Sequence, residues 1–245
     1  MLDLRALREA LWRPTLNPRE TGEQAAAPLS PSPLVGEGRG GGAARPKPAR
    51  GLTRRPALSL HQGRHGADRP VGPGVVLALR HPVSIVGVIA RKGKAHATSE
   101  AMERHFGIAC PPAGESRTSD HLALHWCGFE QWYAVADGFA DGALHEDLRD
   151  RLAGLASVAD QSHGRIILHL EGPRARDLLA KGTGLDLHPR AFGPGRSAVT
   201  QMAHVGVHIA QIGPDAFELS LFRGFAESFW EWLEEMSDEF GYEVR

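Results

Sequence analysis

From about residue 70 onward, apolar residues recur in two patterns, one typical of β-strands and one typical of amphipathic helices. The order strand, helix, two strands, helix occurs twice. In the first half, the patterns predict elements at 75–79, 83–90, 97–106, 122–126, 131–135 and 144–155. In the second half, they predict elements at 165–170, from 173, at 198–204, 207–211 and 217–222, and from 225. We therefore expect an α+β protein of two similar halves.

A short motif supports the repeat. Residues 128–132 read Gly-Phe-Glu-Gln-Trp, and residues 213–217 read Gly-Pro-Asp-Ala-Phe. Each has a glycine, an acidic residue two positions on and an aromatic residue two positions further, at a constant offset along the chain. An internal duplication explains this spacing most simply. We expect the halves at 56–157 and 158–245.

The last predicted helix has an unusual tryptophan. Six apolar side chains form one stripe at 100° per residue: Phe225, Phe229, Trp232, Leu233, Met236 and Phe240. Trp230 lies about 110° from the centre of this stripe, where a helix normally meets solvent. Two interpretations stay open, because Trp230 can pack under a neighbouring loop or lie in an interface with a partner subunit.

The stretch 160–182 contains the most distinctive local pattern. Alternation over 165–170 predicts a strand with one buried face. Pro173 stands where a proline can open a helix, and Gly182 stands where a left-handed residue can close one. The segment therefore predicts a strand, a tight turn and a short helix.

This segment resembles the folate-binding fold of the glycine-cleavage aminomethyltransferases. Within that superfamily, 178–182 (Leu-Leu-Ala-Lys-Gly), 185–189 (Leu-Asp-Leu-His-Pro) and 229–235 (Phe-Trp-Glu-Trp-Leu-Glu-Glu) are similar to the gamma subunit of heterotetrameric sarcosine oxidase. The resemblance is specific over 158–240 and weaker over 75–157. It implies that the two halves are ferredoxin-like and together form an aminomethyltransferase folate-binding-domain-like fold.

The resemblance also implies a role. It makes the chain a structural, non-catalytic subunit of a flavoenzyme that demethylates sarcosine to glycine, with hydrogen peroxide and a one-carbon unit passed to tetrahydrofolate. FAD, FMN, NAD and tetrahydrofolate are then expected in partner subunits, none on this chain. The expected partners are the alpha, beta and delta subunits.

One departure from the aminomethyltransferases bears on catalysis. That family carries a Gly-Gly-Val segment followed by paired aspartates, and here the corresponding run is 205–210, Val-Gly-Val-His-Ile-Ala. Isoleucine and alanine cannot stabilise a developing iminium. The alternative is a stand-alone folate-binding protein or folate-dependent aminomethyltransferase, which would need a carboxylate from Asp160 or Asp215.

Asp160, Ser162 and His163 invite comparison with a hydrolase triad. If residues 162 and 163 lie in a strand, their side chains point to opposite faces, which excludes a nucleophile–base pair. We expect no catalytic residues, and take Asp160, Ser162 and Arg165 as candidates for a folate-like pocket or an interface.

The remaining features exclude several classes of function. His121 with His125, and His204 with His208, are four apart in strand-like segments, too far apart for one zinc ion, so no metal is expected. Cys110 and Cys127 indicate a reducing compartment rather than a disulfide framework. A net charge of −1 argues against nucleic acid or anionic lipid as a partner. No apolar run is long enough to cross a bilayer, so the chain is expected to be cytoplasmic.

The first 55 residues differ from the rest. We expect a short N-terminal helix followed by a disordered linker rich in Pro, Gly and Arg. Its later part, 39–55, holds six basic residues and no acidic one. A polyanion-binding tail is the functional alternative to a solvated linker.

Overall fold

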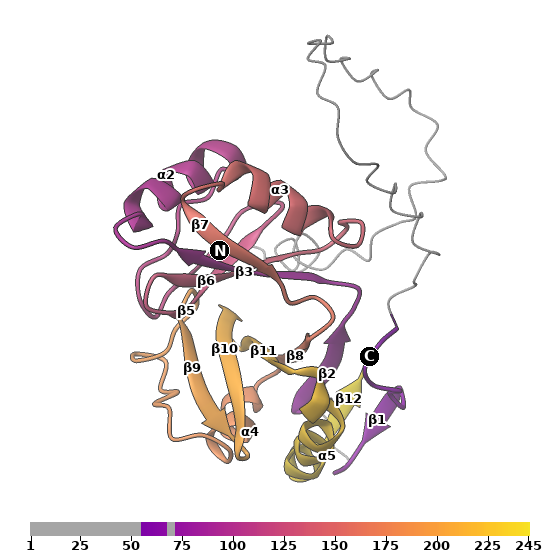
Figure 1. The fold of residues 1–245 in the computed structure, drawn as a ribbon. Coiled ribbons are helices and arrows are strands. Elements are labelled where there is room, and N and C mark those ends of the chain that lie inside the picture. Colours follow the sequence, from indigo (N-terminus) through magenta and orange to yellow (C-terminus); the bar gives the residue numbers. More distant parts are fainter. Residues whose placement is uncertain (1–54, 68–71) are drawn as a thin grey trace, which may run out of the picture. The chain divides into compact units, whose positions relative to one another are not determined.

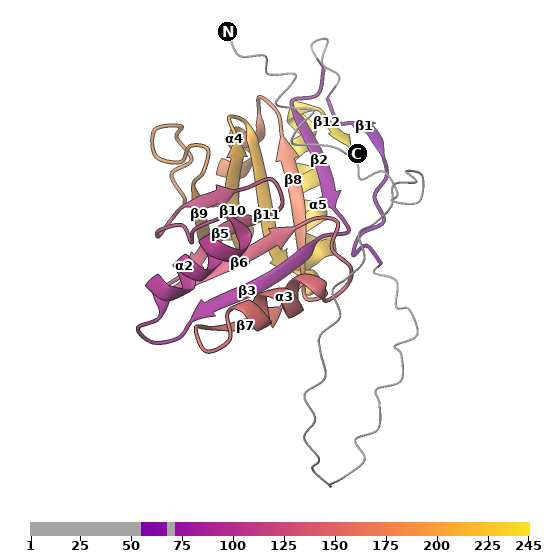
Figure 2. The same cartoon turned by 90° about the horizontal axis from the view of Figure 1, so that it is seen from above.

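Two sheets are stacked face to face, with helices on the outer side of each (Figures 1 and 2). They are seen in a computed structural model that describes residues 55–67 and 72–245. The expected N-terminal helix and nearly all of the linker lie outside these residues. Among the described residues, no helix is long and apolar enough to span a membrane.

One sheet has five strands in the order β4-β5-β6-β3-β7. The strands are β3 (Ser84–Ala90), β4 (Ser116–Thr118), β5 (Ala123–Gly128), β6 (Gln131–Ala136) and β7 (Ala156–Asp160). Helices α2 (Ala95–Phe106) and α3 (Ala143–Arg151) cover its outer face. Met102, Leu144 and Leu148 are almost fully buried in the core between these helices and the sheet.

The other sheet has seven strands in the order β1-β12-β2-β8-β11-β10-β9. The strands are β1 (Gly63–His65), β2 (Val75–Arg80), β8 (Arg165–Glu171), β9 (Ser197–Met202), β10 (Val205–Gly213), β11 (Ala216–Phe222) and β12 (Tyr242–Val244). Helices α4 (Ala175–Ala180) and α5 (Ala226–Ser237) pack on its outer face, with short 3-10 turns η1 (Arg223–Phe225) and η2 (Asp238–Phe240) on either side of α5.

The two halves share one strand order. Strands β3, β5, β6 and β7 lie in the spatial order β7-β3-β6-β5, and β8, β10, β11 and β12 lie in the order β12-β8-β11-β10 once β2 is set aside. Each set alternates with two helices in the manner of a ferredoxin-like unit. Both hairpins carrying the repeated motif have a register irregularity, before Gly128 and before Gly213. The α+β fold class is confirmed.

Strand β2 departs from the expected division. The sequence pattern predicts it in the first half, yet it lies in the seven-stranded sheet, parallel to β12 and antiparallel to β8. Strand β7 begins before the expected boundary at 157/158 and ends after it. Apolar alternation identifies a strand without identifying its neighbours, because pairing depends on residues far away in the chain.

The buried stripe of α5 also differs from the prediction. Ala226, Phe229, Trp230, Leu233 and Ser237 are buried, whereas Phe225 is 49% exposed. Trp230 is only 7% exposed and belongs to the core between α5 and the sheet. Most of the Trp230 surface is therefore covered by packing within the chain, the first of the two interpretations. A role in a subunit interface would involve only the small remainder.

Gly182 follows α4 for a different reason from the one expected. Its φ is not in the left-handed region, whereas Gly172, before the helix, has φ +133°. A Cβ on Gly182 would lie 2.5 Å from the Trp232 ring and 2.8 Å from Met202. The position therefore needs glycine because α5 packs against this loop.

We predict that Gly182→Ala lowers the free energy of unfolding by about 1–3 kcal/mol, because the added methyl group forces apart a packed contact. Urea denaturation measures the change. Gly184→Ala is the matched control, since nothing lies within 4 Å of its added Cβ. Equal midpoints for the two variants would show that α5 does not press on this loop.

Candidate functional site between the two sheets

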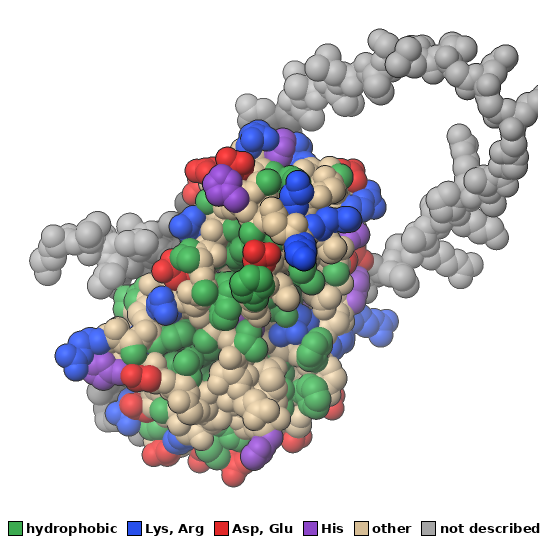
Figure 3. Space-filling view, turned by 60° about the vertical axis from the view of Figure 1, so that its left-hand side comes forward, with side chains coloured by type: hydrophobic (Ala, Val, Ile, Leu, Met, Phe, Trp, Pro, Cys, Tyr) green, Lys and Arg blue, Asp and Glu red, His purple; other side chains and the backbone are tan. Residues whose placement is uncertain are grey.

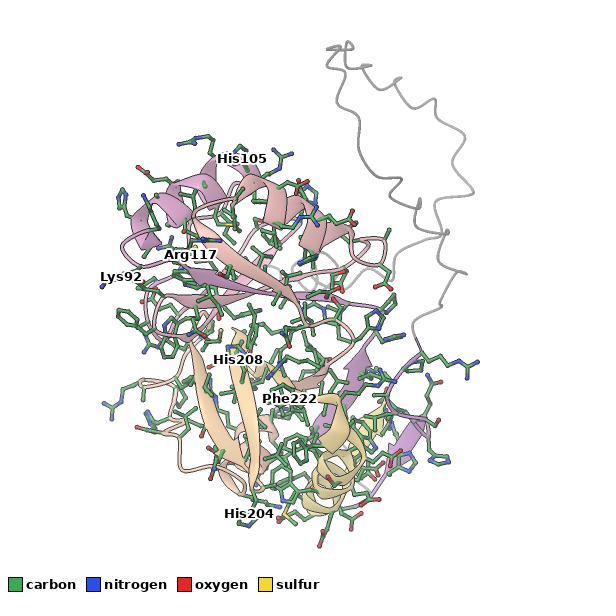
Figure 4. All side chains as sticks on the ribbon, in the orientation of Figure 1. Lys92, His105, Arg117, His204, His208 and Phe222 are labelled. Carbon is green, nitrogen blue, oxygen red and sulfur yellow. The ribbon has the colours of Figure 1, made fainter. Side chains whose placement is uncertain are left out.

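The inner faces of the two sheets meet across polar side chains. His125 comes from β5 and Tyr133 from β6, while His208 comes from β10 and Glu218 and Ser220 come from β11. We call these five residues the polar cluster. Along β11, Phe217, Leu219 and Leu221 join the core under the helices, so the alternate residues face the other sheet. Figure 4 labels His208, which lies between the sheets.

The two histidines of the polar cluster are buried and close together. Their ring centroids are 5.6 Å apart, and the Tyr133 ring meets His208 edge-on at 5.5 Å. His208 Nε2 donates to the Trp126 carbonyl at 3.1 Å, and His125 Nδ1 lies 2.9 Å from Ser116 Oγ. Burial lowers the pKa of His208 to about 4. Burial, with His208 and Arg80 nearby, lowers the pKa of His125 well below its usual value. Both rings are therefore neutral at pH 7.

Arg80 connects the two sheets through two carboxylates. From the end of β2 it donates to Glu218 Oε1 at 2.8 Å, and it makes a two-bond contact with Asp137 at 2.7 and 3.2 Å. Asp137 directly follows β6 of the five-stranded sheet, whereas β2 and β11 belong to the other. Charge-assisted bonds of this geometry are among the stronger hydrogen bonds in proteins. The carboxylate of Glu218 is therefore already paired with the Arg80 guanidinium.

Arg165, the first residue of β8, is a buried cation that, unlike Arg80, is held by a serine and aromatic rings. It is 6% exposed, and its guanidinium donates to Ser220 Oγ at 3.1 Å and to the Ser220 carbonyl at 3.0 Å. Its Cζ lies 4.9 Å from the ring centroid of Tyr133 and 4.6 Å from that of Phe222. Among the described residues, no carboxylate pairs with it.

The other residues singled out from the sequence lie at the end of β7 and in the turn that leads to β8. Asp160 Oδ1 accepts a bond from the Ser162 amide at 2.9 Å, which closes the turn. Ser162 Oγ bonds to both the amide and the carbonyl of Ile85, at 3.0 and 3.3 Å. His163 pairs with Asp141 at 3.0 Å. The assumption that Ser162 and His163 lie in a strand was wrong, and their side chains bond to other residues.

The space beside the polar cluster is small. It measures about 10 Å³, room for roughly one water molecule. A second depression, which Ser162 and Arg165 help to line, measures about 20 Å³. Pockets for molecules the size of a folate usually measure roughly 300–1,000 Å³. As these side chains stand, the site does not fit a pterin ring.

Strand β10 contains residues 205–210, the run that corresponds to the aspartate pair of the aminomethyltransferases. Ala210 faces the polar cluster, while Ile209 lies in the core under the helices. The two carboxylates considered as substitutes, Asp160 and Asp215, are exposed. The carboxylate that does face the inner space is Glu218, which pairs with Ala210 in register.

Sequence reasoning singled out Arg165 and Ser162 but missed Glu218 and Arg80. The alternation Phe217, Glu218, Leu219 was a usable signal, since a charged residue inside a strand with one buried face must lie on the other face. Its partner Arg80 stands 138 positions away in the chain. No local pattern could indicate that pairing.

Cys110 and Cys127 are free and partly buried, and burial raises the pKa of each thiol to about 12. Both are therefore protonated and weakly nucleophilic at neutral pH. Within residues 55–67 and 72–245, no three His, Cys, Asp or Glu side chains lie together as a metal site would require.

We predict that His208 makes the free energy of unfolding fall as the pH falls from about 6.5 to about 4. The unfolded chain takes up a proton near 6.5, whereas the folded chain does so only near 4, so protons favour unfolding in this window. The contribution of His208 is on the order of 3 kcal/mol. Urea denaturation across this window measures it.

His208→Gln should make this pH dependence shallower, although His125 keeps part of it. The exposed His121→Gln is the control and should leave the slope unchanged. Identical slopes for His208→Gln and the wild type would contradict the buried, neutral state of this ring.

Comparison with known proteins identifies relatives of this arrangement. The model of the sarcosine oxidase, gamma subunit family matches residues 92–239. Sarcosine oxidase subunit gamma of Corynebacterium sp. (strain U-96) is 30% identical over 143 residues, which cover 57% of this chain and 69% of the relative. The subunit of the same name from Arthrobacter sp. is 30% identical over 156 residues, covering 63% and 76%.

Solved structures agree. A chain of the heterotetrameric sarcosine oxidase from Corynebacterium sp. U-96 has a TM-score of 0.62 at 29% identity, covering 69% of this chain and 87% of that one. The glycine cleavage system aminomethyltransferase T from Bartonella henselae has a TM-score of 0.54 at 20% identity, covering 70% and 48%, and shares the fold. The aminomethyltransferase-like architecture is thereby confirmed, and the chain belongs to the sarcosine oxidase gamma subunit family.

Proposed function

We propose that this protein is the gamma subunit of a heterotetrameric sarcosine oxidase and contributes a folded scaffold rather than catalytic groups. The observation that carries the proposal is the family match over 92–239, together with a fold that covers 87% of a chain in the solved heterotetramer. The assembled enzyme would oxidise the N-methyl group of sarcosine and release glycine, hydrogen peroxide and a one-carbon unit for tetrahydrofolate.

The interior of the chain supports a role without chemistry of its own. Ala210, in the run that corresponds by resemblance to the paired aspartates of the aminomethyltransferases, faces the inner space, and Glu218 is paired with Arg80. The inner space measures about 10 Å³, room for about one water molecule. FAD, FMN, NAD and tetrahydrofolate would then bind to the partner alpha, beta and delta subunits.

The surface supports contact with other proteins. Phe129, at the tip of the β5–β6 hairpin, is 83% exposed, and Val199 on β9 is 55% exposed. Figure 3 shows hydrophobic side chains gathered in the middle of one face, with charged side chains nearer its margin. Exposed apolar patches with a polar rim are typical of protein interfaces.

We also propose that the assembled enzyme works in the cytoplasm. The unpaired thiols of Cys110 and Cys127 support this location, because a reducing compartment keeps cysteines free.

We predict that the full chain co-purifies at a fixed ratio with its flavoprotein partners when they are expressed together. We expect a stable complex because the exposed apolar side chains of this protein would be buried against the partners. Affinity capture followed by quantitative mass spectrometry gives the ratio, and an unrelated tagged protein in the same cells is the control. A monomeric chain that does not co-purify with the flavoproteins would count against the proposal.

We predict that the isolated chain does not bind tetrahydrofolate at micromolar concentration, because the inner space is too small. Calorimetric titration checks this. The alternative function, a stand-alone folate-binding protein or aminomethyltransferase, requires tight binding that is lost in Glu218→Gln or in Asp160→Asn. Binding that depends on either carboxylate would replace our proposal with that alternative.

A further inference from the structure

A depression at one end of the space between the sheets is lined by basic side chains. Four arginines and two histidines contribute to it: Arg55, Arg80, His81, His163, Arg165 and Arg223. No aspartate or glutamate lines it, and its remaining residues are apolar apart from Ser162. We call this the basic depression. It collects residues from β2, from the β7–β8 turn, from β8 and from η1, far apart in the sequence.

The neighbouring carboxylates neutralise only part of this charge. Asp137 and Glu218 bind Arg80, and Asp141 binds His163. Arg223 instead donates to backbone carbonyls, those of Arg55 and Pro56, each at 3.2 Å. Within the described part of the chain, neither Arg165 nor Arg223 has a carboxylate partner. The depression therefore keeps a positive charge.

Arg165 is the unusual member because it is buried. An arginine remains protonated at any physiological pH, and a buried cation without an opposite charge is costly. Ser220 accepts two of its five N–H groups, on the Nε edge of the guanidinium. Its Cζ lies over the rings of Tyr133 and Phe222, the latter labelled in Figure 4, and these contacts limit its movement.

We propose that the basic depression binds a carboxylate group, with Arg165 at its floor and Arg223 at its rim. The planar fork of a guanidinium matches the two oxygens of a carboxylate, and the aromatic rings fix the plane of that fork. The space of about 20 Å³ suits a small head group, so the rest of the ligand lies outside. The carboxylate comes either from a free small acid or from an acidic side chain of a partner subunit. The second source rests on the function proposed above.

The first arm of the test uses the full chain and sodium succinate, compared with sodium chloride at equal ionic strength. For a free acid, we expect a saturable rise in Tm of about 3–6 °C at a tenfold excess over Kd. Arg223→Gln should abolish this rise. Arg117→Gln should keep it, since Arg117 is also exposed and donates to a backbone carbonyl, that of Ala109, but lies on β4.

The second arm uses the complex with the flavoprotein partners. For a partner side chain, we expect Arg223→Gln to weaken association by at least about tenfold at low salt, whereas Arg117→Gln leaves it unchanged. Arg165→Lys, which keeps the charge but loses the fork, should weaken binding in whichever arm responds. Its folding is checked first by circular dichroism.

Each outcome decides the matter. A succinate effect lost in Arg223→Gln identifies a free acid as the ligand, and an association defect without a succinate effect identifies a partner side chain. If Arg223→Gln and Arg117→Gln behave alike in both arms, the basic depression is not a carboxylate site. If the wild-type chain forms no complex, the proposed function fails, and the succinate arm alone decides the site.

Discussion

The packing of the two sheets depends on hydrogen-bond partners for the polar side chains that their inner faces bring together. Arg80 meets this requirement by joining Glu218 of one sheet to Asp137 beside the other. A second connection is made by the backbone, where Ser116 donates to Gly195 at 2.7 Å and Ser197 donates to Gly114 at 3.0 Å. Buried hydrogen-bonding groups left unpaired cost free energy, so these contacts constrain how the sheets meet.

The order of elements could be read from the sequence, since apolar period alone separates strands from helices. The strands β1, β4 and β12 escaped notice, because three residues are too few to show a period, and the five-residue strand β7 was also missed. The buried side of α5 was misjudged because the surrounding residues extend the core around the helix as far as Trp230. The partner of β2 could not be inferred, because strand register and order are tertiary properties.

The site was less accessible to sequence reasoning than the fold. Arg165 stood out by its place at the start of an alternating strand, and it proved to be buried. Ser162 and His163 were misassigned to a strand, although the glycine that follows them favours a turn. Arg80 and Glu218 come close enough to pair only because β2 and β11 both lie next to β8 in the sheet. The sequence does not indicate that arrangement. Family resemblance supplied the role of the chain, which no residue pattern alone could supply.

The insertion of β2 between β8 and β12 has a consequence for biosynthesis. Tyr242, Glu243 and Val244 lie in register with Val75, Val76 and Leu77. A ribosome must therefore synthesise residues 242–244 before this edge of the sheet can close, so β2, made early, has to wait for a strand made far later. Contacts of such sequence separation slow folding. During translation, the outer edge of β2 stays open to the chaperones that recognise unpaired strands.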